Sequence, residues 1–283
     1  MNKIIDGKII SEKIMDDLKL KVQEANAQGI YPELAVILVG DDPASQVYVK
    51  NKQLACEKLG VKSKTIKLES TIEQKELEKT INELNQDKNI TGILVQLPLP
   101  KHINEEEVLS KIDARKDVDG FHVINSGKLL RGIKCIKPCT PKGVMTMLEY
   151  MNINPEGKNA VIIGRSNLVG KPLALMMLAK NATVTVCHSK TQNLKEITKN
   201  ADILVVAIGK ANFVTKDMIK QGAIVIDVGI SRIDGKLYGD VNFDDVYDSV
   251  SLITPVPGGV GKMTICTLMQ NTLQAAIDIK NHE

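Results

Sequence analysis

The segment Val161–Pro172 (VIIGRSNLVGKP) constrains the possible folds more than any other stretch of the chain. The apolar run Ala160–Ile163 ends at Gly164, and a polar turn then leads into a second apolar run. This order predicts a buried strand, a tight turn and a helix, and such a turn gathers backbone N–H groups and a helix N-terminus at one point, which suits a diphosphate. The motif departs from the usual dinucleotide fingerprint, since Ser166 replaces a glycine and Gly170 comes one residue late. It also fits an ordinary strand-to-helix turn.

Further apolar runs in the second half of the chain favour the dinucleotide interpretation. Four strands are predicted, at 159–163, 183–187, 203–207 and 223–227, and helical segments at 171–179 and 193–198 separate the first three. Strands and helices that alternate in this way indicate a doubly wound, Rossmann-type domain with a parallel sheet.

The first half of the chain shows the same alternation. Strands are predicted at 34–39, 61–68 and 91–97, with helices between them. Ser11 is expected to cap the first helix, Asp42-Pro43 to begin the second, and Thr71 with Gln74 to form a capping box for the third. This pattern also indicates a parallel sheet.

Composition bounds the class of protein. A length of 283 residues suggests two domains, and 43% hydrophobic residues suffice for a core in each. The net charge of +3 argues against a nucleic-acid or membrane-surface partner, and no apolar run approaches the length of a membrane span. Asp6 interrupts the N-terminal apolar residues before a signal-peptide core can form. The five cysteines are scattered, which predicts reduced thiols in a cytoplasmic protein without a metal site.

Four polar side chains fall near the carboxyl ends of the predicted first-half strands, where ligands of parallel sheets bind: Tyr48, Lys52, Gln96 and Asp119. Tyr48 and Lys52 are four residues apart and share one face of a helix. A lysine held near apolar walls can lose its proton near neutral pH and then serve as a base or acid. Taken singly, each residue also fits a structural or solvated role.

The end of the second strand in a dinucleotide-binding domain lies near the adenosine ribose, where NAD-specific proteins place a carboxylate. Here that strand leads into Cys187–Thr191 (CHSKT), which contains no carboxylate. Hydroxyl groups, Lys190 and Arg165 from the glycine turn would instead hold a 2′-phosphate, so the sequence favours NADP. The alternative is that His188 and Lys190 belong to a solvated loop.

A glycine- and proline-rich segment, Thr254–Thr264 (TPVPGGVGKMT), directly precedes the last predicted helix, at 263–279. Glycines allow a ligand to lie against backbone, and the helix N-terminus offers further N–H groups. The last helix is expected to cross back to the first domain. The predicted division is therefore 1–137, joined by 263–283, for the first domain and 138–262 for the Rossmann-type domain.

Seven motifs together resemble the bifunctional methylenetetrahydrofolate dehydrogenase/cyclohydrolase (FolD) family, in order and over essentially the whole chain. They are YVKNK (48–52), GILVQLP (92–98), DVDG (117–120), PCTPKG (138–143), GRSNLVGK (164–171), CHSKT (187–191) and PVPGGVG (255–261). One departure is Lys262, where the family usually has proline.

The resemblance implies an N-terminal α/β folate-binding catalytic domain and an NADP-binding Rossmann-type domain. It implies that the protein oxidises 5,10-methylenetetrahydrofolate with NADP⁺ and hydrolyses the methenyl product to 10-formyltetrahydrofolate, in one-carbon metabolism and purine biosynthesis. Lys52 would then handle the protons of hydrolysis, Gln96 would tune it, Tyr48 would pack on the folate and Asp119 would hydrogen-bond the pterin.

The resemblance also implies the remaining site residues and the assembly. The folate pocket would be lined by Val95, Leu97, Pro257, Gly258, Gly259 and Val260. The NADP site would contain Gly164, Arg165, Ser166, Ser189 and Ile230. Family members are usually homodimers.

Three alternatives stay open at this point. A dehydrogenase-only folate enzyme would tend to lack the lysine at position 52. A hydroxy-acid dehydrogenase needs a histidine paired with a carboxylate, and neither His122 nor His188 has that context. A non-catalytic NADP-binding regulator would not need Tyr48, Lys52, Gln96 and Asp119 together.

Overall fold

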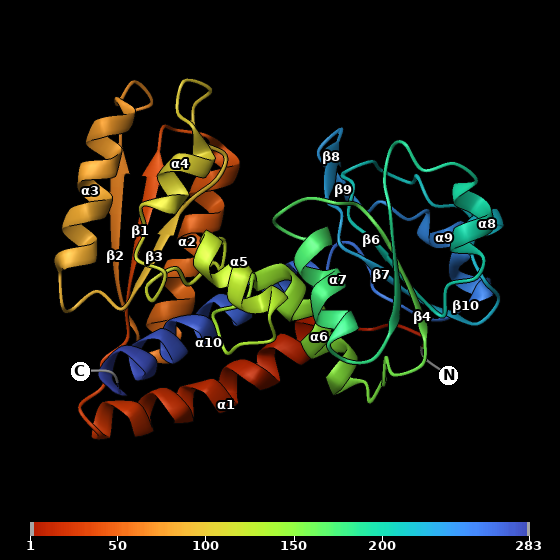
Figure 1. The fold of residues 1–283 in the computed structure, drawn as a ribbon, viewed down its shortest axis with the longest axis horizontal. Helices are drawn as coiled ribbons and strands as arrows, with labels where there is room; N and C mark the ends of the chain where they lie inside the picture. Colours follow the sequence, from red (N-terminus) through yellow and green to blue (C-terminus); the bar gives the residue numbers. More distant parts are fainter. Residues whose placement is uncertain (1–2, 282–283) are drawn as a thin grey trace. The chain divides into compact units, whose positions relative to one another are not determined.

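The computed structural model describes residues 3–281, which form two compact units. The three-stranded unit comprises Lys13–Cys139 and the described part of Ile265–Glu283. The five-stranded unit comprises the described part of Met1–Glu12 and Thr140–Thr264. Both units combine a parallel sheet with helices, so the predicted two-domain α/β fold is confirmed (Figure 1).

In the three-stranded unit the sheet has the order β2 (Lys62–Leu68), β1 (Glu33–Val39), β3 (Gly92–Val95), and both pairings are parallel. The central strand β1 is buried on both faces because helices cover both. Since side chains alternate along a strand, Leu34, Val36 and Leu38 enter one core, and Ala35, Ile37 and Val39 enter the other.

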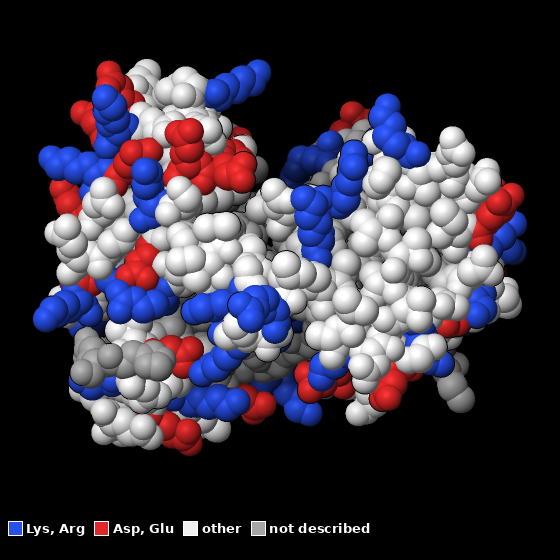
Figure 2. Space-filling model, in the orientation of Figure 1, with Lys and Arg blue, Asp and Glu red and all other residues white. Residues whose placement is uncertain are grey.

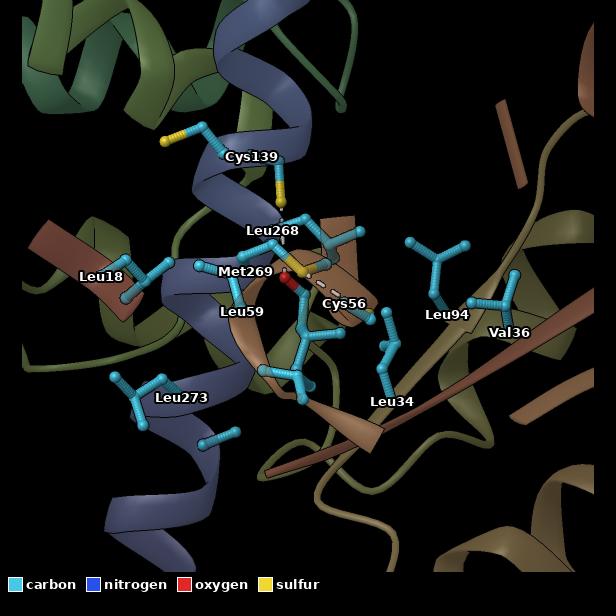
Figure 3. Close-up of a cluster of buried hydrophobic side chains, with 14 of the residues drawn as sticks. Leu18, Leu34, Val36, Cys56, Leu59, Leu94, Cys139, Leu268, Met269 and Leu273 are labelled. Atoms are coloured by element: carbon cyan, nitrogen blue, oxygen red, sulfur yellow. Dashed lines mark hydrogen bonds between the residues drawn. The ribbon is translucent and has the colours of Figure 1, made fainter. Parts of the chain in front are cut away.

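The helices that accompany this sheet are α2 (Pro43–Leu59), α3 (Gln74–Gln86), α4 (Glu105–Ser110) and α5 (Val123–Leu130). Two longer helices, α1 (Gly7–Ala27) and α10 (Val260–Asn281), also contribute residues to the unit. Figure 3 shows Leu268, Met269 and Leu273 of α10 in the same buried cluster as Leu34 and Leu59. The last helix therefore returns to the first domain, as predicted.

In the five-stranded unit all strand pairings of the main sheet are parallel, in the order β10-β7-β6-β4-β5. The strands are β4 (Asn159–Ile163), β5 (Thr183–Cys187), β6 (Ile203–Val206), β7 (Ala223–Asp227) and β10 (Val250–Ile253), with a separate hairpin of β8 (Ser231–Ile233) and β9 (Lys236–Tyr238). The helical segments are α6 (Cys139–Tyr150), α7 (Gly170–Leu178), α8 (Leu194–Thr198), α9 (Phe243–Val246), and the short 3₁₀ turns η1 (Lys216–Met218) and η2 (Tyr247–Ser249).

Helix ends account for most differences from the predictions. Helix α1 begins at Gly7, because the carboxylate of Asp6 accepts hydrogen bonds from Lys8 N (2.8 Å) and Ile9 N (3.1 Å), whereas Ser11 only donates back to a helix carbonyl. The predicted capping box at Thr71 is wrong, because α3 begins at Gln74.

Three further differences concern α10, β10 and α5. Helix α10 begins at Val260, three residues earlier than predicted. Strand β10 extends the predicted four-stranded sheet to five, and helix α5 was not predicted.

The remaining expectations from the sequence concern surface charges, possible membrane spans, possible metal ligands and cysteines. On the face of the three-stranded unit seen in Figure 2, acidic and basic side chains are interspersed. Among the described residues no helix combines the length and apolarity needed to cross a membrane. Over residues 3–281 there is no group of three or more His, Cys, Asp or Glu side chains placed to hold a metal ion. All five cysteines are free thiols, as predicted.

Candidate active site

Helix α2 positions the predicted catalytic lysine. It begins as predicted, with the Asp42 carboxylate accepting from Ser45 N (2.7 Å) and Pro43 in the first turn. Tyr48 and Lys52 follow on one face, a helical turn apart. Lys52 is only 8% exposed, whereas Tyr48 is 46% exposed. The lysine therefore lies in a nearly dry environment, and the tyrosine ring is open to solvent.

Gln96 is brought to Lys52 by the sheet. It directly follows β3, and its N–H extends the ladder by donating to Ile37 O (2.9 Å). Its amide Nε2 donates to Leu97 O (2.7 Å), which leaves Oε1 to accept from Lys52 Nζ (2.8 Å). The two residues are 44 positions apart in sequence, and the structure joins them in one hydrogen bond, in agreement with the prediction that Gln96 contacts the lysine.

The electrostatics of this site favour neutral forms. Burial lowers the pKa of the Lys52 amine, and the charge of Asp119 opposes that shift. Burial raises the pKa of the Asp119 carboxyl, the charge of Lys52 opposes this, and nearby Asp117 adds to the rise. Asp119 is recessed among protein atoms although part of the residue reaches solvent. The charges of Lys52 and Asp119 therefore influence each other's pKa. The Lys52 amine loses its proton at a lower pH than the amine of an exposed lysine does.

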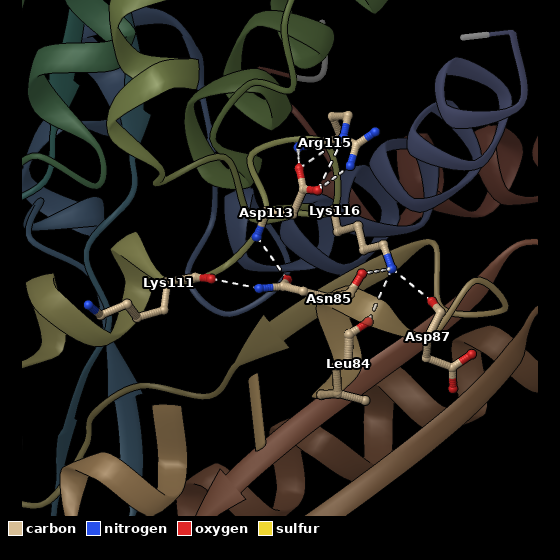
Figure 4. A network of polar contacts seen from close by, with 7 residues as sticks. All are labelled: Leu84, Asn85, Asp87, Lys111, Asp113, Arg115 and Lys116. Atoms are coloured by element: carbon tan, nitrogen blue, oxygen red, sulfur yellow. Dashed lines mark hydrogen bonds and ion pairs between the residues drawn. The ribbon is translucent and has the colours of Figure 1, made fainter. Parts of the chain in front are cut away.

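The loop that carries Asp119 is fixed at its start by two buried side chains. Lys116 Nζ donates to the carbonyl oxygens of Leu84 (3.1 Å), Asn85 (2.8 Å) and Asp87 (2.8 Å) at the end of α3 (Figure 4). The Asp117 carboxylate accepts from the N–H groups of Gly120 and His122 and from the Asn125 amide, at 2.8–3.1 Å.

Helix α10 also holds this loop. The buried Asn271 amide donates to Val118 O and Lys137 O, both at 2.9 Å. Gly120 adopts φ +79°, and a Cβ there would lie 2.6 Å from the Lys137 carbonyl carbon, so the two chain segments touch. Sequence reasoning missed Asn271, because its partners lie more than 130 residues away.

The remaining predicted folate residues fall in both units. Val95 is buried in the core beside β1, and Leu97 is half-buried. The segment Pro257–Val260 belongs to the five-stranded unit, where Pro257 is exposed and Val260 is buried.

The start of α1 packs closely against the Pro257–Val260 segment. Lys8 N donates to Gly258 O (3.2 Å), and a Cβ on Gly7 would lie 2.1 Å from Gly259 O. Here glycine permits the start of α1 to touch this loop. Exposed Lys262 lies in the first turn of α10, and its N–H donates to Gly259 O (3.2 Å), a bond that the usual proline could not make.

The turn after β4 forms a close-fitting cradle. Gly164 has φ +129°, and a Cβ there would lie 2.3 Å from Ala207 O at the end of β6. A Cβ on Gly170 would lie 2.1 Å from Gly164 O. Only glycine fits at both positions, which is the packing that a dinucleotide-binding turn requires.

The helix N-terminus beside this turn is already satisfied. Ser166 Oγ accepts from Val169 N (3.1 Å), Ser166 O accepts from Lys171 N (3.1 Å), and Pro172 has no N–H. This corrects the expectation that the N-terminus of α7 offers free donors. Within residues 3–281, the N–H groups of Arg165–Leu168 make no hydrogen bond to the protein, so this exposed stretch holds the donors available to an anion.

The segment after β5 is an ordered turn without a carboxylate. His188 N donates to Thr191 Oγ1 (2.8 Å), and Lys190 N donates to His188 Nδ1 (3.1 Å). Ser189 and Lys190 are exposed, as are Arg165 and, after β7, Ile230. The residues predicted to bind the cofactor thus all follow the carboxyl ends of β4, β5 and β7, and they fit a dinucleotide with an added phosphate.

Comparison with known proteins finds two domains of one family along the chain. Residues 5–119 match the tetrahydrofolate dehydrogenase/cyclohydrolase catalytic domain, and residues 138–280 match the NAD(P)-binding domain of the same family. The chain is 56% identical over 279 residues to the bifunctional protein FolD of Streptococcus agalactiae, covering 98% of each chain.

Solved structures agree. The crystal structure of the bifunctional enzyme FolD from Campylobacter jejuni has a TM-score of 0.96 and 52% identity, covering 98% of this chain and 99% of that one. The Trypanosoma brucei enzyme, complexed with NADP and inhibitor, has a TM-score of 0.92 and 36% identity, covering 98% of each. With both of its domains matched and 98% of its length shared, this chain belongs to the tetrahydrofolate dehydrogenase/cyclohydrolase family.

Proposed function

We infer that the protein oxidises 5,10-methylenetetrahydrofolate with NADP⁺ and then hydrolyses 5,10-methenyltetrahydrofolate to 10-formyltetrahydrofolate. The observation that carries this inference is the match of the chain to both family domains, and the hydrogen bond of the buried Lys52 to Gln96 supports the hydrolysis. The first-domain residues 1–137 with 263–283 would hold folate, and residues 138–262 would hold the cofactor.

The cofactor site would consist of Gly164, Arg165, Ser166, Ser189 and Ile230. When bound, NADP⁺ supplies the acceptor for the hydride that leaves the methylene carbon. The free N–H groups of Arg165–Leu168 would bind the diphosphate. Two features support NADP over NAD: no carboxylate follows β5, and Arg165, Ser189 and Lys190 are exposed nearby in the turns. The NADP complex of the Trypanosoma relative is consistent with this choice.

Lys52 would handle protons during hydrolysis. As the neutral amine favoured by burial, Lys52 Nζ accepts a proton from the water that adds to the methenyl carbon. It then returns that proton to N5 of the folate as the bond from the carbon to N5 breaks, and the hydroxyl group on the carbon loses its proton to solvent, which leaves a formyl group on N10. The net reaction consumes one water and releases one proton. Gln96 holds Nζ in place and favours its ammonium form, which prevents the amine from becoming too weak a base.

The other folate contacts would orient the substrate. The Asp119 carboxyl can hydrogen-bond the adjacent N–H groups on the pterin edge, and the exposed Tyr48 ring can stack on a flat ligand. Val95 and Leu97 would line the pocket. We also propose a cytoplasmic homodimer that serves purine biosynthesis. The five free thiols suit a reducing compartment, and sedimentation of the purified protein would measure the assembly.

One absorbance experiment tests the function. The protein is mixed with 5,10-methylenetetrahydrofolate and NADP⁺, with NAD⁺ in a parallel cuvette, and both reduced cofactor and methenyltetrahydrofolate are followed. Reduction with NADP⁺ and little methenyl signal is expected. Persistent methenyl signal would refute the cyclohydrolase assignment, and no reduction by folded protein would refute the dehydrogenase assignment.

A further inference from the structure

Two buried aspartates, neither of which the reaction above uses, meet at the carboxyl edge of the five-stranded sheet. Asp227 is the last residue of β7 and is 4% exposed, and Asp240 follows β9 and is 0% exposed. No lysine or arginine pairs with either carboxylate in the described residues. Buried carboxylates without a cation are costly unless hydrogen bonds satisfy them.

Backbone N–H groups satisfy both carboxylates. Asp240 accepts from three consecutive residues after β6: Ile208 N (2.7 Å), Gly209 N (3.0 Å) and Lys210 N (2.6 Å). Asp227 accepts from Gly229 N (3.2 Å), Asp240 N (2.9 Å) and Val241 N (2.9 Å). The two side chains therefore tie together the segments that follow β6, β7 and β9.

Two glycines make this arrangement reciprocal. A Cβ on Gly229 would lie 2.0 Å from Asp240 Cγ, and a Cβ on Gly239 would lie 1.9 Å from Asp227 Oδ2. Each carboxylate thus rests against a glycine beside the other aspartate in the chain. We call the set Asp227, Gly229, Gly239 and Asp240 the aspartate clasp.

The aspartate clasp borders the cofactor cradle. Strand β6 lies between β4 and β7, and Ala207, directly before the segment held by Asp240, touches Gly164 of the cradle. Gly229, held by Asp227, directly precedes Ile230 of the proposed cofactor site. We propose that Asp227 and Asp240 are positioning residues for NADP⁺, which fix the segments after β6 and β7 in the shape that the cofactor binds. This inference rests on the proposed function of this unit.

The test compares cofactor binding with cyclohydrolase activity in Asp240→Asn, Asp240→Ala and Asp227→Asn. Binding of NADP⁺ alone is measured by calorimetry, and hydrolysis of methenyltetrahydrofolate is measured without cofactor. We expect NADP⁺ affinity to fall about tenfold or more, because each variant weakens buried hydrogen bonds that hold the segments after β6 and β7. The NADP⁺ affinity of Asp240→Ala should fall further than that of Asp240→Asn, because asparagine keeps one acceptor oxygen. Cyclohydrolase kcat/KM should stay within twofold.

Asp202→Asn is the matched control. Asp202 lies in the same unit, directly before β6 at the opposite edge of the sheet, and its carboxylate accepts from Asn159 N (2.9 Å) and Lys220 Nζ (2.6 Å). This control should keep NADP⁺ affinity. Gly229→Ala, which forces a Cβ into the Asp240 carboxylate, should lower affinity with both aspartates present.

Two results would overturn the positioning role. One is unchanged NADP⁺ affinity in folded Asp240→Ala. The other is a parallel loss of NADP⁺ affinity and cyclohydrolase activity, because that would show a general need of the fold. A wild-type protein that binds NADP⁺ but reduces none of it would refute the proposed function, and it would leave the binding comparison valid.

Discussion

Replacement of Gln96 by glutamate should change the proton affinity of Lys52. The substitution puts a carboxylate oxygen where an amide oxygen now accepts from Nζ at 2.8 Å. A hydrogen bond to a charged partner is worth about 1.5–3 kcal/mol. Since 1.36 kcal/mol corresponds to a factor of ten, the neutral fraction of Lys52 at pH 7 should fall about ten- to one-hundred-fold. Cyclohydrolase activity should fall equally and recover at high pH.

The assay follows the decay of methenyltetrahydrofolate between about pH 6 and pH 9.5, after subtraction of spontaneous hydrolysis. Gln96→Met is the matched control, since it removes the acceptor without adding charge and so favours the neutral amine. The acidic limb of the pH–rate profile should therefore move to higher pH in the glutamate variant and to lower pH in the methionine variant. An acidic limb at the same pH in both variants and the wild type would refute the role of Lys52 as the base.

Three further predictions follow from buried charges. Lys52→Met should abolish hydrolysis but keep NADP⁺ binding. Burial lowers the pKa of Lys52, so the unfolded wild-type chain binds a proton more tightly than the native state does, and the stability of the wild type rises with pH toward 10.5. In thermal melts the Lys52→Met variant should therefore be more stable than the wild type at pH 7, and this difference should shrink near pH 10. Lys116→Met strands three carbonyls and should lower the free energy of unfolding by about 2–4 kcal/mol, against little change for exposed Lys111→Met, in denaturant titrations. Burial raises the pKa of Asp227 to about 7, so the native state holds a proton that the unfolded chain releases near pH 4; stability should fall as pH rises from about 4 to 7, and Asp227→Asn should flatten that slope.

Local chemistry explains which elements could be predicted from sequence. The start of α2 at Asp42-Pro43 depends on neighbouring residues, and it was predicted. The cap of α1 was not, because Asp6 and Ser11 are both good caps and only the fold selects between them. Thr71 and Gln74 match a capping box, yet the Gln74 side chain accepts from Asn104 N (2.9 Å), 30 residues away.

The site shows the same limit. That Tyr48 and Lys52 share a helix face follows from their spacing, but the pairing of Lys52 with Gln96 required the family resemblance, because sheet topology brings them together. The aspartate clasp was invisible for that reason: its partners come from three strand ends. Strand β10 (VSLI) was missed because it lacks the continuous apolar run expected of a parallel strand. Its Ser251 is exposed and its Leu252 is half-buried.

The discontinuity of both units bears on how the chain acquires its structure during translation. The core of the three-stranded unit includes Leu268, Met269 and Leu273, so residues 13–139 emerge from the ribosome with a large apolar face uncovered. The five-stranded unit needs its N-terminal segment, since Ile5 N donates to Ile253 O (2.8 Å). In both units, therefore, a segment made early in translation can complete its packing only after a segment made late has emerged. Fragments made by cutting between residues 119 and 138, where the two family domains meet, should be aggregation-prone, although that boundary looks like a natural place to separate them.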